Sequence, residues 1–355
     1  MVFSFAEYSR AEISIDELVK QSRITEGDVA VRELSRWNGA SKILVWDIGI
    51  DISGLANSAP DVEFILVDSV ADAMQHASSV DAIIGTCASE LFDAAEKLVW
   101  VQITWAGAER CLAVDAVADG TVVMSNMQKM SSPVIAEHAI AMMMALSRNL
   151  PQFVNLMDAG DWSEGKKSTD GMMSIAGKKM LVAGLGGIGT EVARLGNALG
   201  MSVSGTRNSS REGPDYVDHV GLSHELTDMA ASADVIVNAL PATEATIDLF
   251  DAEFFSKAKT GAIFINVGRG TTVVTKDLLA ALESGQISGA GLDVTAPEPL
   301  PADSPLWQRD DVIITPHISS SGRELERHSV LLHENVRRYI AGERLLNVVD
   351  PQKGY

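Results

Sequence analysis

The chain has 355 residues, which is more than one average domain and enough for two. Its hydrophobic content of 46% and charged content of 21% are those of an ordinary globular protein, and no apolar run reaches the roughly 18–20 residues that cross a membrane. A net charge of −20 argues against nucleic acid and anionic lipid as partners, so any site for an anion must be built locally.

Residues 1–10 carry neither the basic segment nor the long apolar core of a secretory signal, so we expect a cytoplasmic protein without a membrane partner. The two cysteines, Cys87 and Cys111, stand in no spacing that a metal site uses, and no metal is expected. Because cytoplasmic proteins rarely keep disulfides, we predict two reduced thiols.

The first domain is predicted from a regular alternation that begins near Lys42. Residues 1–40 form a mixed, polar N-terminal extension with one possible short helix over Ile15–Lys20. Short β-rich segments then alternate with helix-like ones, which is typical of parallel βαβ units. They predict a five-stranded, flavodoxin-like sheet with strands at Lys42–Trp46, Val62–Val67, Asp81–Gly85, Trp100–Thr104 and Thr121–Met124.

A helix with serines and a proline at its start is predicted over Ser131–Leu146. Its Met142–Met144 cluster is expected to pack in a core, because the segment is apolar on every side. Pro151 and the Gly160–Gly177 segment look like the crossing between domains. A last helix, about Arg323–Ala341, is long enough to pack back on the first domain.

The second domain opens on a glycine-rich loop. Met180–Ala183 is typical of a buried strand, three glycines follow at G-x-G-x-x-G spacing, and a helix pattern runs on from Thr190. The first glycine permits a tight turn, the second lets the backbone approach a pyrophosphate, and the third lets helix and strand pack closely. An ordinary strand–helix turn is the alternative, but this context favours a dinucleotide site.

Charged residues follow several later strands, where parallel sheets bind ligands. The strands are expected at Met201–Thr206, Val235–Leu240, Ala262–Val267, Gly289–Val294 and Val312–Thr315. Arg269, Glu298 and His317 follow the last three of these. A guanidinium holds a carboxylate through two hydrogen bonds, a histidine delivers a proton, and a carboxylate keeps the imidazole protonated and oriented. Each residue alone would be read as structural or solvated, whereas the three together favour reduction of a 2-keto acid.

The residue after the second strand distinguishes the two nicotinamide cofactors. An NAD site carries an acidic residue about 20 positions beyond the glycine loop, whereas this chain has Arg207. A ribose 2′-phosphate would meet its guanidinium and the side chains of Thr206, Asn208 and Ser209. The alternative is a solvated basic turn. The sequence predicts that NADP(H) is preferred, with NAD(H) possible.

With these motifs the sequence resembles the D-isomer-specific 2-hydroxyacid dehydrogenase family, and within it the NADP-preferring glyoxylate/hydroxypyruvate reductases. The resemblance runs from about Lys42 to the C-terminus, and the spacing of Arg269, Glu298 and His317 fits the family. It rests on Gly184–Gly189, Leu240-Pro241, Asn266–Gly270, Gly291–Val294, Pro297–Leu300, Ser304–Trp307 and Thr315–His317.

The resemblance implies an α/β protein of two doubly wound parallel-sheet domains, with a Rossmann NAD(P)-binding domain (residues 149–319) inserted into a flavodoxin-like substrate domain (41–148 and 320–355). It implies that Arg269 binds the substrate carboxylate, that His317 is the acid/base and that Glu298 tunes it. Trp105, Ala106 and Gly107 would form a substrate loop whose N–H groups face the carboxylate, Asp293 would face the nicotinamide carboxamide, and a homodimer is expected. The implied cofactor site comprises Gly184, Gly186, Gly187, Ile188, Gly189, Thr206, Arg207, Asn208, Ser209, Leu240, Pro241, Thr246, Val267, Gly268, Arg269, Asp293 and His317.

Two departures from the family pattern leave the side-chain specificity open. Trp105 puts a large ring beside the substrate loop, and Ile318–Gly322 is more polar than the small-residue segment common there. We expect a reductase of a small 2-keto acid such as glyoxylate or hydroxypyruvate. The alternatives are a phosphite or formate dehydrogenase, with Glu298 against the formate branch, and a dinucleotide-sensing binding protein, against which the chain shows no low-complexity arm.

Overall fold

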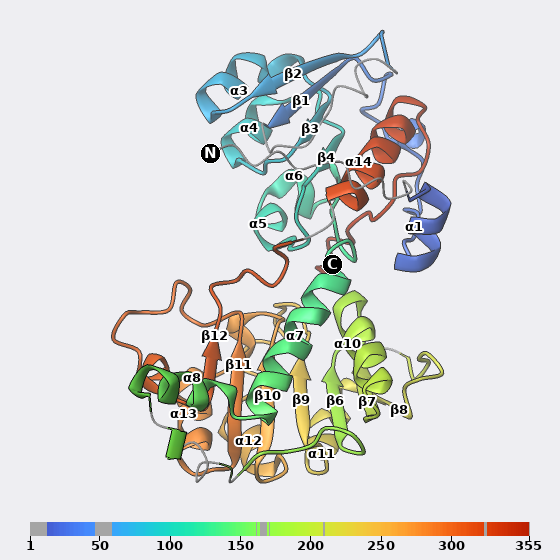
Figure 1. Cartoon of the computed structure of the whole chain (residues 1–355). Coiled ribbons are helices and arrows are strands. Elements are labelled where there is room, and N and C mark those ends of the chain that lie inside the picture. Colours follow the sequence, from blue (N-terminus) through green and yellow to red (C-terminus); the bar gives the residue numbers. More distant parts are fainter. Residues whose placement is uncertain are drawn as a thin grey trace. The chain divides into compact units, whose positions relative to one another are not determined.

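The computed structural model describes residues 13–46, 59–160, 162, 163, 169, 171–208, 210–322 and 325–354. The chain divides into two compact units, residues 1–130 with 324–355 and residues 131–323 (Figure 1). No helix of the described residues is both long and apolar enough to cross a membrane.

Unit 1 is built on a five-stranded parallel sheet in the order β2-β1-β3-β4-β5, the flavodoxin-like order expected from the sequence. Strands β1, β3 and β4 are buried apolar segments, as a sheet covered on both faces requires, whereas the edge strand β2 is mostly exposed or half-buried. The strands are β1 (Lys42–Trp46), β2 (Glu63–Val67), β3 (Ala82–Ile84), β4 (Trp100–Gln102) and β5 (Val123–Ser125).

One core of unit 1 joins the sheet to α1 and α14, and a second core joins it to the helices between the strands. Tyr339 of α14 packs on Trp100 with ring centroids 4.9 Å apart, and its hydroxyl donates to the Asp81 carboxylate. The C-terminal segment thereby completes unit 1. The helices are α1 (Ile15–Ser22), α3 (Val70–His76), α4 (Ser89–Ala94), α5 (Glu109–Leu112), α6 (Asp115–Ala118) and α14 (Leu325–Ile340), with 3-10 helices η1 (Val31–Glu33) and η2 (Ala77–Ser79).

Unit 2 holds a seven-stranded parallel sheet in the order β12-β11-β10-β9-β6-β7-β8. The first strand, β6, lies between β7 and β9, so the strand order reverses beside it, which is where doubly wound folds bind dinucleotides. The strands are β6 (Lys179–Ala183), β7 (Ser202–Arg207), β8 (His219–Leu222), β9 (Val235–Asn238), β10 (Ala262–Asn266), β11 (Ile287–Leu292) and β12 (Val312–Ile314).

Helices cover both faces of this sheet. On one face α7 and α10 lie side by side, and on the other α11, α12 and α13 enclose a cluster of phenylalanines (Figure 1). The helices are α7 (Ser132–Ser147), α8 (Leu150–Ala159), α10 (Gly187–Ala198), α11 (Leu226–Ala230), α12 (Ala252–Lys257) and α13 (Thr275–Glu283), with 3-10 helices η3 (Ser223–Glu225), η4 (Gly270–Thr272) and η5 (Pro305–Gln308).

The structure differs from the sequence expectations in several places. Strand β8 was not predicted, because its four residues include an exposed histidine and a glycine. Helix α8 occupies the start of the segment expected to cross between domains, with Pro151 in its first turn. Helix α7, which the sequence analysis placed in the first domain, is counted with unit 2 because it packs on α10, β10 and β11. Met142 and Met143 are buried in that packing, while Met144 is 37% exposed.

Candidate active site

The carboxyl edge of the unit 2 sheet brings together most of the residues singled out in the sequence. Arg269 follows β10, Asp293 follows β11 and His317 follows β12. These three strands are neighbours, so their ends open on one edge of the sheet. Glu298 lies in the segment between β11 and η5, and its carboxylate contacts the His317 ring.

His317 and Glu298 form a direct pair. The His317 Nδ1 atom lies 2.6 Å from Glu298 Oε1, and the two side chains are 48% and 41% exposed. An ion pair this exposed adds little to stability, but its geometry fixes the orientation of the ring. Since Nδ1 is taken up by the carboxylate, Nε2 is the nitrogen that can exchange a proton with a ligand.

The backbone at His317 takes a left-handed conformation, with φ of 53°. A non-glycine residue keeps this conformation only where its surroundings hold it. The His317 N–H donates to the Asp293 carbonyl oxygen at 2.8 Å, and the N–H groups of Ile318 and Ser319 donate to the Asp293 carboxylate. Asp293 therefore holds the turn that carries the histidine.

Asp293 is 1% exposed. Burial alone would raise the pKa of this carboxyl, but hydrogen bonds from Ser319, Thr315 and the Ile318 N–H outweigh it and hold the pKa below its ordinary value. The expected contact of Asp293 with a nicotinamide carboxamide is thus joined by a second role that sequence reasoning missed.

A buried amide network holds the backbone around Arg269. The Asn238 side chain donates to Asn266 Oδ1 at 2.9 Å and to Thr272 Oγ1 at 2.7 Å, and Thr272 in turn donates to the Arg269 carbonyl oxygen at 2.7 Å. All three side chains are at most 1% exposed. The Arg269 guanidinium is half-buried and donates to the Gly268 carbonyl oxygen at 2.9 Å.

The glycine loop has the geometry that its spacing predicted. Gly184 has φ of 91°, and a Cβ on Gly189 would lie 2.0 Å from the Gly184 carbonyl oxygen, so any larger residue would separate helix α10 from the strand. A Cβ on Gly186 would meet nothing within 4 Å, so the space above this residue is open. Gly187 and Ile188 form the first turn of α10 and are half-buried.

The end of β7 carries the residues expected to distinguish the cofactors. The Arg207 Nε atom is buried without a hydrogen-bond partner among the described residues. Thr206 is 3% exposed, and its hydroxyl oxygen accepts a hydrogen bond from the Gly184 N–H. The Thr206 side chain therefore helps to hold the glycine loop in place. Asn208 is exposed, and Ser209 lies outside the described residues.

The loop after β9 is tied by its own polar groups. The Leu240 N–H donates to Asn238 Oδ1, and the Thr246 hydroxyl donates to the Pro241 carbonyl oxygen at 2.6 Å. Val267 and Gly268 are buried beside it, and a Cβ on Gly268 would lie 2.6 Å from the Leu240 carbonyl oxygen. These predicted cofactor residues line the two strand ends next to the glycine loop.

In unit 1, the predicted substrate loop follows β4. The Asn126 side chain, 1% exposed, donates to the Ala106 carbonyl oxygen at 2.7 Å, and the Met127 N–H donates to the Trp105 carbonyl oxygen at 3.1 Å. Both carbonyl groups therefore point into the unit. Among the described residues, neither the Ala106 nor the Gly107 N–H donates to a protein acceptor.

Cys87 and Cys111 form a disulfide, with Cα atoms 5.3 Å apart, so the prediction of two reduced thiols is wrong. Cys87 lies just beyond β3 and Cys111 lies in α5, just beyond β4. Since β3 and β4 are neighbouring parallel strands, the segments beyond their carboxyl ends meet. The sequence separation of 24 residues conceals this proximity.

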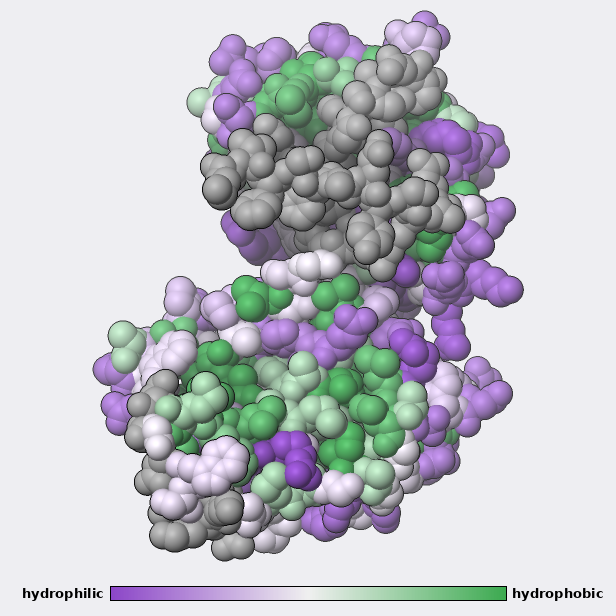
Figure 2. All heavy atoms as spheres, in the orientation of Figure 1, coloured by the Kyte–Doolittle hydropathy of each residue, from purple (hydrophilic) through white to green (hydrophobic). Residues whose placement is uncertain are grey.

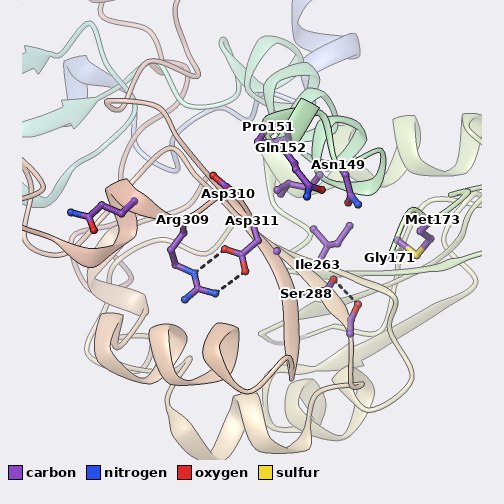
Figure 3. Close-up of a pocket in the computed structure, with 14 residues that line it drawn as sticks. Asn149, Pro151, Gln152, Gly171, Met173, Ile263, Ser288, Arg309, Asp310 and Asp311 are labelled. Atoms are coloured by element: carbon purple, nitrogen blue, oxygen red, sulfur yellow. Dashed lines mark hydrogen bonds and ion pairs between the residues drawn. The ribbon is translucent and has the colours of Figure 1, made fainter. Parts of the chain in front are cut away.

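A cavity of about 520 Å³ opens at the opposite edge of the unit 2 sheet (Figure 3). It lies among the amino ends of β10–β12 and the start of α8, and the Arg309–Asp311 ion pair lines it. None of the site residues expected from the sequence borders it. Among the described residues, no cluster of histidine, cysteine and carboxylate side chains is suited to a metal ion.

The strand order, the glycine loop and the charged carboxyl edge are those of a dinucleotide-dependent oxidoreductase. The sequence model described as "D-isomer specific 2-hydroxyacid dehydrogenase, NAD binding domain" matches residues 140–319. The chain belongs to the D-isomer specific 2-hydroxyacid dehydrogenase family, whose members are NAD(P)-dependent dehydrogenases and reductases. The family and fold expected from the sequence are confirmed.

Three similar proteins illustrate the match. Glyoxylate/hydroxypyruvate reductase B of Escherichia fergusonii is 32% identical over 67% of this chain and 74% of its own length. A family member from Xanthobacter autotrophicus, solved with NADPH and MES, has a TM-score of 0.75 and 29% identity over 90% of this chain and all of that one. An NADPH-dependent glyoxylate/hydroxypyruvate reductase of Sinorhizobium meliloti, solved with NADP and sulfate, has a TM-score of 0.75 and 26% identity over 89% of this chain and all of that one.

Proposed function

We propose that the protein transfers hydride between NADPH and a small 2-keto acid, giving a D-2-hydroxy acid. The observation that carries this proposal is the 2.6 Å pair of His317 and Glu298 on the sheet edge that also holds Arg269. A proton donor with its orienting carboxylate and a guanidinium suited to a carboxylate are the groups that keto-acid reduction needs.

The bound dinucleotide supplies the hydride. His317 supplies the proton to the substrate carbonyl oxygen from Nε2, because Nδ1 is held by Glu298. Glu298 orients the ring through its contact with Nδ1. Arg269 binds the substrate carboxylate and polarises the carbonyl group. The N–H groups of Ala106 and Gly107, which donate to no acceptor among the described residues, are proposed as further donors for the carboxylate.

The residues of unit 2 fit an NADP-type dinucleotide. The open space above Gly186 suits a pyrophosphate at the start of α10, and the buried, unpaired Nε of Arg207 suits a ribose 2′-phosphate. The end of β7 carries no carboxylate that would repel that phosphate. Asn208 and Ser209 are proposed to assist Arg207, and NAD(H) is the weaker cofactor in this proposal.

Steady-state turnover of a panel of acids with NADPH and with NADH tests the proposal. Glyoxylate, hydroxypyruvate and bulkier 2-keto acids are expected to be reduced, with kcat/KM higher for NADPH. Arg207→Asp is expected to raise KM for NADPH by about 10- to 100-fold, the worth of one charge-assisted contact, and to leave KM for NADH within a few-fold. Arg211→Asp is the matched control, because Arg211 already pairs with Glu225.

Two results would contradict this assignment. Oxidation of phosphite or formate without reduction of any keto acid would support the alternative dehydrogenases. Tight NADPH binding without turnover of any acid would support a dinucleotide-sensing protein. Equal kcat/KM for the two cofactors would remove the NADPH preference and leave the reaction standing.

The homodimer and the cytoplasmic location are further parts of the proposal, although the Cys87–Cys111 disulfide would be an exception among cytoplasmic proteins. Apolar side chains gather on the face over α7 and α8 (Figure 2), and Val154 and Met157 of α8 are 54% and 76% exposed. Exposed apolar side chains gathered in this way favour a protein interface. Met157→Asp is expected to shift the sedimentation coefficient from dimer to monomer.

A further inference from the structure

Unit 2 contains a chain of hydrogen-bonded side chains that leads to the turn carrying His317. Neither the sequence motifs nor the similar proteins assign a role to this chain. It runs from His138 on α7 through Thr315, at the end of β12, to the buried Asp293. His138 Nε2 lies 2.9 Å from Thr315 Oγ1, and Thr315 Oγ1 lies 2.7 Å from Asp293 Oδ1. The His138 side chain is 24% exposed, so the chain is largely shielded from solvent.

The direction of these hydrogen bonds follows from the number of protons. The Asp293 carboxylate is held in its ionised form and can only accept. Thr315 has one hydroxyl proton and donates it to Asp293. The short contact between Thr315 and His138 therefore needs a donor on the imidazole, so His138 carries its proton on Nε2 and donates to the Thr315 oxygen.

Asp293 connects these side chains to the turn that carries His317. Its carbonyl oxygen accepts from the His317 N–H, and its carboxylate accepts from the N–H groups of Ile318 and Ser319. The Thr315 carbonyl oxygen also accepts from the His317 N–H, at 3.0 Å. The backbone N–H of His317 is therefore held by Asp293 and Thr315. The side chains of these two residues are hydrogen-bonded to each other, and Thr315 contacts His138.

We propose that His138 and Thr315 are positioning residues, which fix Asp293 and through it the turn that aims His317. Neither side chain is proposed to exchange a proton with the substrate. The effect on turnover rests on the proposed function of His317, whereas the effect on the turn does not. Loss of the chain should let the turn relax, separate His317 from Glu298 and misplace Nε2, which lowers kcat more than it changes KM.

Pairs of variants separate the hydrogen bonds from the bulk of the side chains. Thr315→Val keeps the shape and removes the hydroxyl, whereas Thr315→Ser keeps the hydroxyl. His138→Leu removes the donor, whereas the side-chain amide of His138→Gln keeps one. We expect Thr315→Val and His138→Leu to lower kcat by about 10- to 100-fold with KM for the keto acid within about threefold, and the conservative variants to stay within a few-fold of the parent protein.

A second measurement uses the protein without substrate. Diethyl pyrocarbonate modifies accessible imidazole nitrogens, and peptide masses report the rate at His317. Release of Nδ1 from Glu298 should make His317 react several-fold faster in Thr315→Val, and Thr315→Ser should react at the parent rate. NADPH titration by fluorescence and the thermal midpoint verify that each variant is folded.

The outcomes distinguish this inference from the proposed function. Unchanged kcat and unchanged modification of His317 in Thr315→Val would overturn it. Equal losses in Thr315→Val and Thr315→Ser would also overturn it, because the hydroxyl would then be irrelevant. If the parent protein reduces no keto acid, the proposed function fails, and the modification rates still decide whether the chain holds the turn.

Discussion

The two units place their candidate functional groups at the same kind of location, just beyond the carboxyl ends of neighbouring parallel strands, but they use different chemistry. Unit 2 presents charged side chains, Arg269 and the His317–Glu298 pair. Unit 1 presents backbone N–H groups, at Ala106 and Gly107. In both units a buried neutral amide supports the backbone, Asn238 through Thr272 at Arg269 and Asn126 at the loop, and unit 2 adds the ionised Asp293 at the His317 turn.

This difference determines which functional groups can be tested by an amino-acid substitution. A side chain can be removed without moving its neighbours, so a change in unit 2 reports on one functional group. A backbone N–H cannot be removed by an ordinary substitution, so unit 1 is accessible only through the residue that orients the loop. The predictions below test this contrast, beginning with the largest effect.

The proposed proton donor of unit 2 should give the largest loss. His317→Ala is expected to lower kcat by about two to four orders of magnitude, the usual contribution of a positioned acid or base. Steady-state kinetics with a keto acid and NADPH measure it. His219→Ala is the control, since this exposed histidine lies on the edge strand β8, at the other end of the sheet from β12. Near-parental turnover in His317→Ala would refute the assigned mechanism.

The side chain proposed to bind the substrate carboxylate should give the next largest loss. Arg269→Lys is expected to raise KM for the keto acid and to lower kcat, with kcat/KM down by about 10- to 100-fold, because lysine provides a point charge without the planar fork. Arg309→Lys is the matched control, since Arg309 pairs with Asp311 at the opposite edge of the sheet. Unchanged kinetics in Arg269→Lys would mean that the carboxylate is held by the backbone of unit 1.

The loop of unit 1 should respond more weakly, and mainly in KM. Asn126→Ala removes the donor to the Ala106 carbonyl oxygen, so the loop can turn its N–H groups away, and KM is expected to rise by about tenfold with little change in kcat. Asn335→Ala is the control, because Asn335 is as buried but donates to Gln102 and to the Leu346 carbonyl oxygen. Similar KM changes in both variants would show a general loss of stability.

The smallest effect concerns acid stability. The pKa of Asp293 is lowered in the folded protein, so its stabilising contribution is complete above the unfolded pKa of about 3.9 and is lost as pH falls through the lower folded value. Urea unfolding between pH 5 and pH 3 should therefore show a steeper loss of free energy of unfolding in the parent than in Asp293→Asn. Parallel curves would contradict the ionised state assumed for the His138 chain.

The sequence predicted the parts of the fold and site that depend on neighbouring residues. Buried strands appear as apolar runs, the glycine loop has a fixed spacing, and Arg269, Glu298 and His317 are charged residues in an apolar context. Asn126 was not identified, and Thr315 was noted only as part of a motif without a role of its own, because each acts through a partner about 20 residues away that only the sheet brings near. His138 was missed for the same reason, since 177 residues separate it from Thr315.

The Cys87–Cys111 disulfide has a consequence for how the chain unfolds. The closed loop contains α4, β4 and the Trp105–Gly107 segment, so the cross-link restricts this whole stretch in the unfolded ensemble. In the chain-entropy description, a loop of this length stabilises the native state by about 3 to 4 kcal/mol. A preparation kept in a thiol reductant and one kept without it would then differ in melting temperature and urea midpoint, although their sequences are identical. The concentration of thiol reductant in the buffer should therefore be the same in all samples whose stabilities are compared.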